Sequence, residues 1–376
     1  MSLERDKPAI PVTHHESPAG FVIFEPRGDR PAREEPFLSA VLANLRRQSQ
    51  ATFVLSLLFL GIGIALLVID AVPVLGVALV VVFGLLALYS VFAWWSGFGE
   101  MRALLETPIR EVRPQPDGLQ HTGDSVSVRI GDGQASWVRG WLPAGYRALL
   151  ARERRVWVLG PSARGRVVLV LPGSVLCAAA KTTRAPRRGS RPLPEVWQRS
   201  SAPKDDPVLT AHLGAARRLH GGLLTLFSLT VAAAAFLPAL ALFENWTPMD
   251  IGELPLIAVA AAVFVVLVQR IVRSMLRLRR VNLAARAVTW TPLPARLDAE
   301  PKIIAGYFAR ATARVSWPDG TERTVQLGRV SVDLIANVQA SGLLWVIGTP
   351  EPNGATLVGV PGLPVLNHVV VKDRVS

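Results

Sequence analysis

Apolar residues gather in four long stretches, at about 52–70, 73–95, 222–243 and 254–272. A helix rises about 1.5 Å per residue, so about 20 apolar residues cross a bilayer core of roughly 30 Å. No Lys, Arg, Asp or Glu lies in the middle of any stretch, although Asp70 stands at the end of the first. Buried helices of a soluble protein usually give shorter runs that polar faces interrupt. The pattern therefore predicts four transmembrane helices.

A short amphipathic helix is predicted before each pair of stretches. At 34–50, Leu38, Val41 and Leu42 fall at helical spacing on one face. The two carboxylates at its start lie where the helix dipole favours anions, and the proline that follows them suits a first turn. The stretch at 205–220 repeats this arrangement.

The chain contains two copies of one unit. The sequence at 34–38 reads Glu-Glu-Pro-Phe-Leu and that at 205–209 reads Asp-Asp-Pro-Val-Leu, and an arginine pair follows each. Each copy then runs into two apolar stretches and a β-rich segment. Further on, Trp157 and Trp345 occupy matching apolar runs, which predicts core packing and leaves a ligand groove as the alternative. These matches predict an internal duplication in which both copies have the same orientation.

The β-rich segment of the first copy consists of short apolar runs separated by turn residues. Strands are predicted at Ile109–Arg113, Ser125–Ile130, Ser136–Trp141, Val156–Leu159 and Val167–Leu171, with a hairpin turn at 131–133 and a short helix at 146–152. The second copy keeps the same landmarks. Each β-domain is small, so two lying together would bury more surface than either alone.

These patterns divide the chain into six parts. The predicted fold class is an α + β membrane protein, with two tandem transmembrane hairpins, each followed by a small cytoplasmic β-rich domain. The parts are a disordered tail at 1–33, a helix with two spans at 34–97, a β-rich domain at 98–180, a basic proline-rich linker at 181–207, a helix with two spans at 208–272 and a second β-rich domain at 273–376.

Charge gives the predicted helices an orientation. The chain carries 41 Lys and Arg against 28 Asp and Glu, a net charge of +13. The connections within each hairpin contain no Lys or Arg, and positive residues stay on the cytoplasmic side. Both termini and both β-domains are therefore expected in the cytoplasm, on a multi-pass protein of the plasma membrane. The arginines expected at anionic lipid headgroups are Arg46, Arg47, Arg217, Arg218, Arg270, Arg273, Arg277, Arg279 and Arg280.

The same reasoning limits the expected ligands. A soluble protein this basic would be expected to bind nucleic acid. Here the arginines are expected to set the membrane topology, so the lipid bilayer and its headgroups are the expected contacts and no nucleic-acid binding is expected. The six histidines form no metal-type pair with cysteine or carboxylates at local spacing, and no phosphate-binding loop or nucleophile elbow is present. No catalytic residue, metal site or cofactor is therefore predicted.

The missing catalytic groups and the domain plan together suggest a function. We expect a non-enzymatic scaffold, assembly factor or regulatory subunit of a bacterial membrane complex, whose β-domains contact a protein partner or a second copy. Two alternatives stay open. A transporter or channel component would need polar residues along the helix bundle. A membrane-bound enzyme acting on envelope or lipid substrates would need clustered acid, base or metal ligands.

Overall fold

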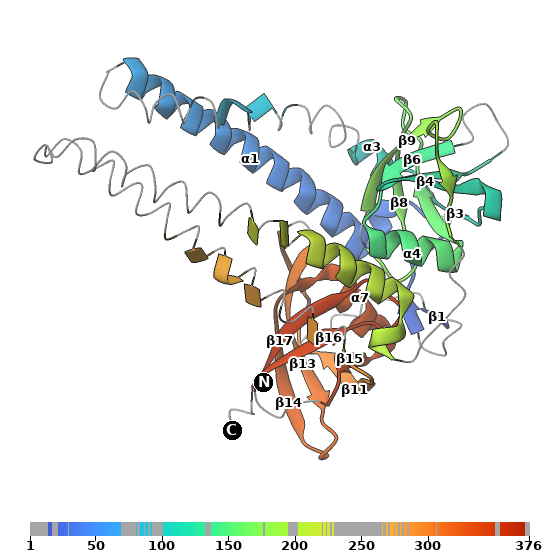
Figure 1. Ribbon diagram of the computed structural model, residues 1–376, viewed down its shortest axis with the longest axis vertical. Coiled ribbons are helices and arrows are strands. Elements are labelled where there is room, and N and C mark those ends of the chain that lie inside the picture. Colours follow the sequence, from blue (N-terminus) through green and yellow to red (C-terminus); the bar gives the residue numbers. More distant parts are fainter. Residues whose placement is uncertain are drawn as a thin grey trace, which may run out of the picture.

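A computed structural model of the chain shows two large β-sheets with helices packed around them (Figure 1). It describes residues 14–16, 22–28, 30–68, 101–131, 137–175, 177–194, 202–219, 286–305, 307–349 and 354–372, with separate positions between 80 and 91, 221 and 228, and 265 and 283. The first sheet and its helix are green in Figure 1, and the second is orange to red.

The first large sheet is open and antiparallel. Its strand order is β10-β4-β5-β6-β9-β8-β7-β3. The strands are β3 (Ile109–Val112), β4 (Leu119–Thr122), β5 (Ser125–Arg129), β6 (Trp137–Trp141), β7 (Val156–Leu159), β8 (Arg166–Val170), β9 (Cys177–Thr183) and β10 (Arg191–Pro192). All five strands predicted for this domain are confirmed to within one residue at each end. The predicted hairpin turn at 131–133 lies mostly outside the described residues.

The second large sheet closes into a barrel. Its order is β11-β15-β16-β17-β14-β13-β12, and β11 also pairs with β13. Six strands therefore form a ring, and β12 lies outside it along β13. The strands are β11 (Trp290–Leu297), β12 (Lys302–Ala305), β13 (Phe308–Ser316), β14 (Glu322–Ser331), β15 (Leu343–Ile347), β16 (Gly354–Gly359) and β17 (Leu366–Lys372).

The two sheets share one strand order. The strands β3, β7, β8, β9, β6, β5 and β4 of the first correspond to β11, β15, β16, β17, β14, β13 and β12 of the second. The difference in strand length explains why only the second sheet closes into a barrel. The 8 residues of β11 pair with β15 through 290–294 and with β13 through 295–297. The 4 residues of β3 are all used in pairing with β7.

One helix occupies the same place in each sheet. Helix α4 (Ala144–Glu153) connects β6 to β7, and α7 (Val332–Ser341) connects β14 to β15. The Ser331 side chain caps α7 by accepting a hydrogen bond from the Leu334 amide. Gly342 ends α7 in the left-handed conformation, at φ +67°, which glycine adopts without strain.

A continuous apolar core runs through both sheets. It joins Val126 and Val158 of the first sheet to Val315 and Val346 of the second. A second cluster contains Leu38, Leu42 and the Trp157 side chain, which is 2% exposed. Core packing of Trp157 is therefore confirmed, whereas Trp345 is half-buried in β15.

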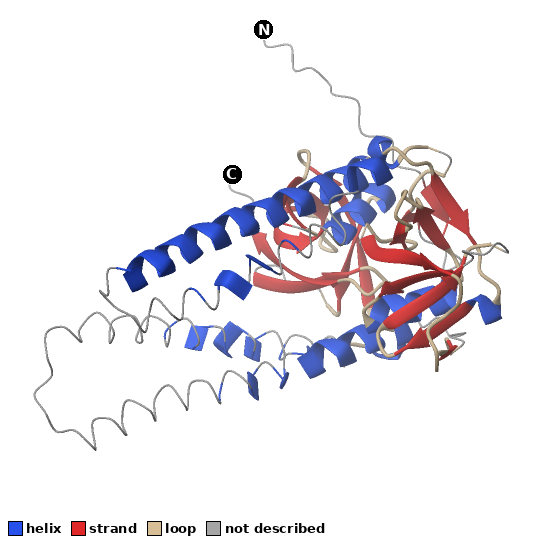
Figure 2. Ribbon diagram, turned by 90° about the horizontal axis from the view of Figure 1, so that it is seen from above, coloured by secondary structure: helices blue, strands red, loops and turns tan. Residues whose placement is uncertain are grey.

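The long helix α1 (Pro36–Val68) changes its surroundings along its length. The predicted face of its first turns is confirmed, because Leu38, Val41 and Leu42 are fully buried. Burying one such side chain stabilises a fold by about 1.5–3 kcal/mol. The far end of the helix extends away from both sheets, as the long helix in Figures 1 and 2 shows. From Val54 onward, most of its described large apolar side chains are exposed.

This structure corrects the predicted membrane architecture. None of the helices that the structure describes qualifies as a membrane span. The predicted fold class of four transmembrane helices is therefore contradicted, and a mixed α/β fold with two β-sheets takes its place. The multi-pass plasma-membrane localisation is not supported for the same reason. A run of apolar residues reports composition, and composition alone does not identify the surroundings of a helix.

The structure describes most of the first predicted span but little of the other three. The first, at 52–70, falls almost wholly within α1, which begins among the β-domains. The spans at 73–95, 222–243 and 254–272 lie largely outside the described residues. The alternatives of a transporter and of a membrane-bound enzyme depended on these spans and are not carried further.

Segments predicted as tail and linker contribute to the fold. Within 1–33, the strands β1 (His14–Glu16) and β2 (Val22–Phe24) pair with each other, and Phe24 is 2% exposed. Within 181–207, β9 continues to Thr183 and β10 pairs with β4. A short helical turn, η4 (Pro203–Asp205), precedes a helix at 207–219.

Candidate functional site

The densest group of buried polar side chains lies at the junction of the two β-domains. Its centre is Asp333, in the first turn of α7 and 4% exposed. One carboxylate oxygen accepts the Tyr146 hydroxyl hydrogen bond at 2.8 Å. The other accepts from the Val175 amide at 2.5 Å and from the Ser174 hydroxyl at 3.3 Å. All three donors belong to the first domain, so this carboxylate joins the two domains.

Asn337 follows one turn later on the same face of α7. Its side-chain amide donates to the Gly173 carbonyl and to the Asp333 carbonyl, both at 2.7 Å. Its side-chain oxygen accepts from the Phe24 amide at 3.0 Å. The Gly173 amide donates in turn to the Phe24 carbonyl at 2.9 Å. The N-terminal strand β2 is therefore fixed between α7 and the loop after β8.

A related contact joins α4 to the second domain. The Arg152 guanidinium donates to the Gly362 carbonyl at 2.7 Å. The Gly362 amide donates to Asp206 Oδ2 at 2.8 Å. Asp206 Oδ1 accepts from the Val208 amide at 2.9 Å and so caps the helix at 207–219. One carboxylate thereby links a helix start to the second domain.

The two halves of the junction differ in a matched way. Asp333 and Gly145 occupy corresponding positions in α7 and α4, and each lies against the loop of the opposite domain. Asp333 meets Val175, which offers an amide hydrogen. Gly145 lies against Pro364, which has none, and a Cβ added at Gly145 would stand 2.6 Å from the proline Cβ. The hydrogen bond between Asp333 and Val175 in one half thus corresponds to the close apolar contact between Gly145 and Pro364 in the other half.

The surroundings of Tyr146 favour its neutral, hydrogen-bond-donating form. Burial raises the pKa of Tyr146 well above 10.0, and the nearby Asp333 carboxylate raises it further. The phenol therefore stays protonated and keeps donating its hydrogen bond. Three donors satisfy Asp333 and three partners satisfy Asn337, so neither side chain is aimed at an open space. The arrangement can hold two domains together.

Burial also shifts the pKa of two further titratable groups. Burial lowers the pKa of His212, in the helix at 207–219, below its usual 6.5. Burial raises the pKa of Glu35, just before α1, above 4.5, although the Arg27 amide donates to its carboxylate at 2.8 Å and opposes this shift. Glu35 therefore anchors the preceding segment of chain.

The arginines predicted to lie at lipid headgroups do not form one site in the described structure. Arg47, Arg217, Arg218, Arg273 and Arg279 are exposed. The side chain of Arg46 and the residues Arg270, Arg277 and Arg280 lie outside what the structure describes. The headgroup contacts depended on membrane spans that the described helices contradict, so they are not carried further.

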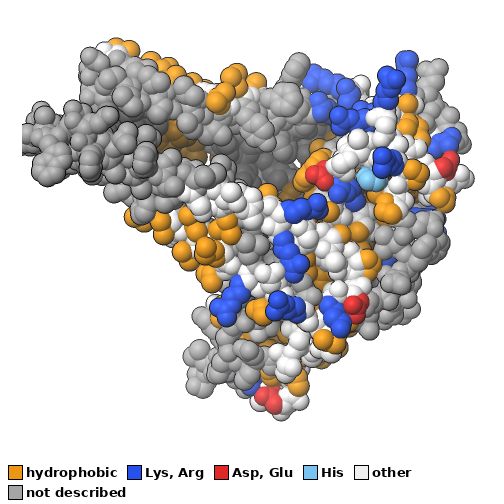
Figure 3. Space-filling model, in the orientation of Figure 1, with side chains coloured by type: hydrophobic (Ala, Val, Ile, Leu, Met, Phe, Trp, Pro, Cys, Tyr) orange, Lys and Arg blue, Asp and Glu red, His pale blue; other side chains and the backbone are white. Residues whose placement is uncertain are grey.

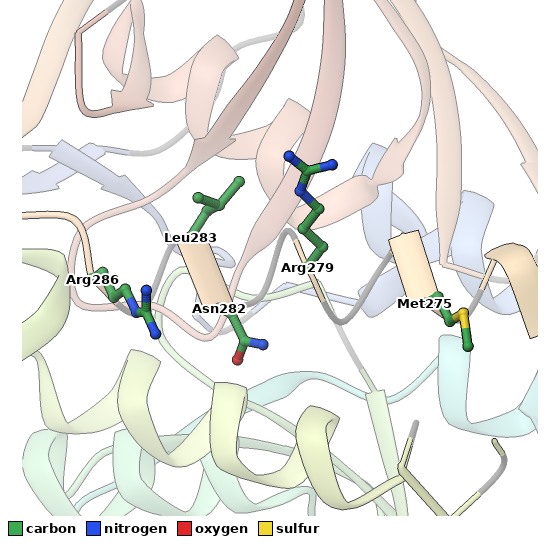
Figure 4. A pocket seen from close by; sticks show the side chains of 5 residues that line it. All are labelled: Met275, Arg279, Asn282, Leu283 and Arg286. Atoms are coloured by element: carbon green, nitrogen blue, oxygen red, sulfur yellow. The ribbon is translucent and has the colours of Figure 1, made fainter. Parts of the chain in front are cut away.

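One of these arginines, Arg279, lines a shallow cavity of about 470 Å³ together with Met275, Asn282, Leu283 and Arg286. Figure 4 shows that the Arg279 and Leu283 side chains point to one side of the segment, and that Asn282 points to the other. The two guanidinium groups do not converge on one point. Binding sites place a few polar groups toward a common ligand, so this cavity is a weak candidate.

Sequence reasoning did not single out Asp333, Asn337 or Tyr146. A weak signal existed, because Asp333 and Asn337 stand four residues apart in a helix of otherwise mostly apolar side chains. Residues four apart share one helix face, so the pair indicated a polar contact on a buried helix. The partners in the first domain could not be deduced from the sequence.

Known proteins offer no guide to this site. Comparison with protein families, with curated proteins and with solved structures finds no match. Within the part of the chain that the structure describes, no group of three or more His, Cys, Asp or Glu side chains could hold a metal ion.

Proposed function

We propose that the chain is a non-enzymatic scaffold that binds a protein partner through the exposed part of α1. The observation that carries this proposal is the exposure of large apolar side chains beyond Phe53. Val54 is 63% exposed, Leu55 53% and Leu58 58%. Contiguous exposed apolar surface marks interaction sites more often than isolated exposed residues do.

The partner chemistry follows from how these side chains are distributed. Among the described side chains from 53 to 65, only Ser56 and Gly63 are buried. Exposure therefore extends over more than one side of the helix, and an apolar helix of this kind needs surroundings on several sides. No charged residue occurs between 51 and 68. The proposed partner accordingly presents apolar helices or strands that pack around α1.

The scaffold role is supported by how α1 is attached. Its first turns share an apolar cluster with Ile109 and Trp157 of the first domain. The helix also contacts β12 and α7 of the second domain. Hydrophobic side chains follow the upper left edge of Figure 3, in the direction in which α1 projects. The helix is thus attached to both domains, and Phe59 in its exposed part stacks on Phe83. Val54, Leu55 and Leu58 stay more than half exposed and are the side chains proposed to meet the partner.

Native co-purification with matched variants tests this proposal. The triple variant Leu55→Gln, Leu58→Gln, Ile62→Gln should lose a protein that co-purifies stoichiometrically with the wild-type full chain. The control Trp141→Gln, Leu219→Gln, Val288→Gln replaces equally exposed apolar residues elsewhere and should keep it. The proposal fails if no protein co-purifies stoichiometrically, or if both variants lose the same one.

A further inference from the structure

The outer wall of the barrel contains a concavity of about 560 Å³ between β13, β14 and the turn that precedes β12. It is lined by Arg310, Arg329, Thr312, Gln326, Gly328 and Glu300, among others. Small-molecule sites of proteins commonly have volumes of about 300–1,000 Å³ and a few polar groups that fix the ligand. This shallow concavity has a volume within that range and carries such polar groups, and none of its lining residues belongs to α1.

A β-bulge shapes the cavity. Ala309 pairs with Val330 and Ala311 pairs with Leu327, so Arg310 alone faces both Gly328 and Arg329. Bulges change the direction of side chains and are frequent beside functional sites. A Cβ added at Gly328 would meet nothing within 4 Å, so the strand surface next to this glycine, between Arg310 and Arg329, is open. The bulge thus leaves space on the strand surface where the two guanidinium-bearing residues lie.

The charges around this cavity are arranged unfavourably in the absence of a ligand. Lys302 pairs directly with Arg310 across β12 and β13, and Arg310 lies opposite Arg329 at the bulge. Like charges directly opposite each other destabilise a sheet. Lys and Arg side chains are visible over the lower part of the molecule in Figure 3. A bound anion would offset the repulsion between these neighbours.

The acidic groups nearby do not neutralise the two central arginines. Asp298 pairs with Arg314 at 2.7 Å. Among the residues that the structure describes, Arg310 and Arg329 have no carboxylate partner. The Arg329 guanidinium lies 4.7 Å from the centre of the Phe308 ring, which holds this charge in place at the bulge. Both guanidinium groups therefore keep their hydrogen-bond donors available.

From this geometry we propose that the bulge cavity binds a small phosphate-bearing anion. Arginine presents donors in a planar fork that matches phosphate oxygens. Arg310 and Arg329 hold the phosphate, and Thr312 and Gln326 add neutral hydrogen bonds. The Glu300 carboxylate repels an anion, so the phosphate lies at the arginine end, and the uncharged body of the ligand lies toward Glu300. A multiply charged phosphate offsets the paired cations better than a single carboxylate does.

Isothermal titration of the full chain with inorganic pyrophosphate tests this proposal. Wild type should show saturable binding to one site. Arg310→Gln and Arg329→Gln should each weaken it by about tenfold or more, because each removes charge-assisted hydrogen bonds. Thr312→Val keeps the charge and should weaken binding by about threefold. Unchanged thermal unfolding would show that the variants fold.

The matched control is Arg188→Gln, which removes one exposed charge in the loop before β10. It should leave the affinity for pyrophosphate unchanged. Equal weakening by Arg188→Gln would show that net charge alone attracts the anion, and would overturn the proposed site. So would the lack of saturable binding to wild type. Tighter binding of citrate than of pyrophosphate would overturn the assignment to phosphate.

Discussion

At the scale of single residues, buried polar side chains join the two domains. Asp333 and Asn337 contact the first domain through hydrogen bonds of 2.5–3.3 Å, although both belong to the second. The sequence indicated which leucines and valines would be buried, because helical spacing places Leu38 and Leu42 on one face. It could not indicate the role of Asp333, since three of its donors come from residues more than 150 positions away.

Removing the Asp333 carboxylate should weaken the junction strongly. Asp333→Ala leaves the Val175 amide and the Tyr146 hydroxyl buried without their acceptor, so we expect the free energy of unfolding to fall by about 3 kcal/mol. Tyr146→Phe removes one partner and should cost about 1 kcal/mol. Urea titration of the full chain measures both. Asp117→Ala, at an exposed carboxylate, is the control and should change little.

A change below about 0.5 kcal/mol for Asp333→Ala, within the range of ordinary surface substitutions, would mean that this carboxylate does not join the domains.

His212 should make stability depend on pH. Burial lowers its pKa in the folded chain below the usual 6.5. As the pH falls below 6.5, the unfolded chain takes up a proton before the folded chain does, so the free energy of unfolding decreases. Above pH 6.5 the effect is absent. Replacing His212 with Gln should flatten the decrease, which urea titrations between pH 7.5 and about 5 would detect. Parallel curves for the two proteins would refute this role.

At the scale of helices and strands, local pattern was a good guide where the residues have clear preferences. Val156–Leu159 was predicted as a strand and is β7. The strands β4 and β9 were missed, since Leu-Gln-His-Thr and Cys-Ala-Ala-Ala-Lys-Thr-Thr contain few of the residues that favour strands. Closure of the barrel depends on β11 reaching two neighbours at once, which is a property of the whole sheet.

Two helical glycines should respond to alanine in opposite directions. At Gly145 a Cβ would stand 2.7 Å from His212 Cβ and 2.6 Å from Pro364 Cβ, so Gly145→Ala should destabilise the fold by about 1–3 kcal/mol. At Gly214, in the helix at 207–219, a Cβ would meet nothing within 4 Å. Gly214→Ala should therefore stabilise the fold by about 1 kcal/mol.

Thermal and urea unfolding of the two single variants gives the comparison. If Gly145→Ala were neutral, the contact between α4 and the second domain would be looser than the structure has it.

At the scale of the whole molecule, two sheets with one strand order are joined into a single body from which α1 projects. Hydropathy correctly marked 52–70 as strongly apolar, but it predicted a membrane span, and the described helices contradict the four-span architecture. The same side chains are exposed along α1. We propose that a protein partner covers them.

Site-specific photo-cross-linking tests whether a protein partner covers the exposed part of α1. A photoreactive phenylalanine analogue at Leu58, which is 58% exposed on α1, would be compared with the same group at Leu219, which is 62% exposed on another helix. We expect irradiation of the native full chain to join position 58 to a second, different protein, while position 219 gives no such product. Adducts from position 58 that contain no other protein, or identical adducts from both positions, would contradict this expectation.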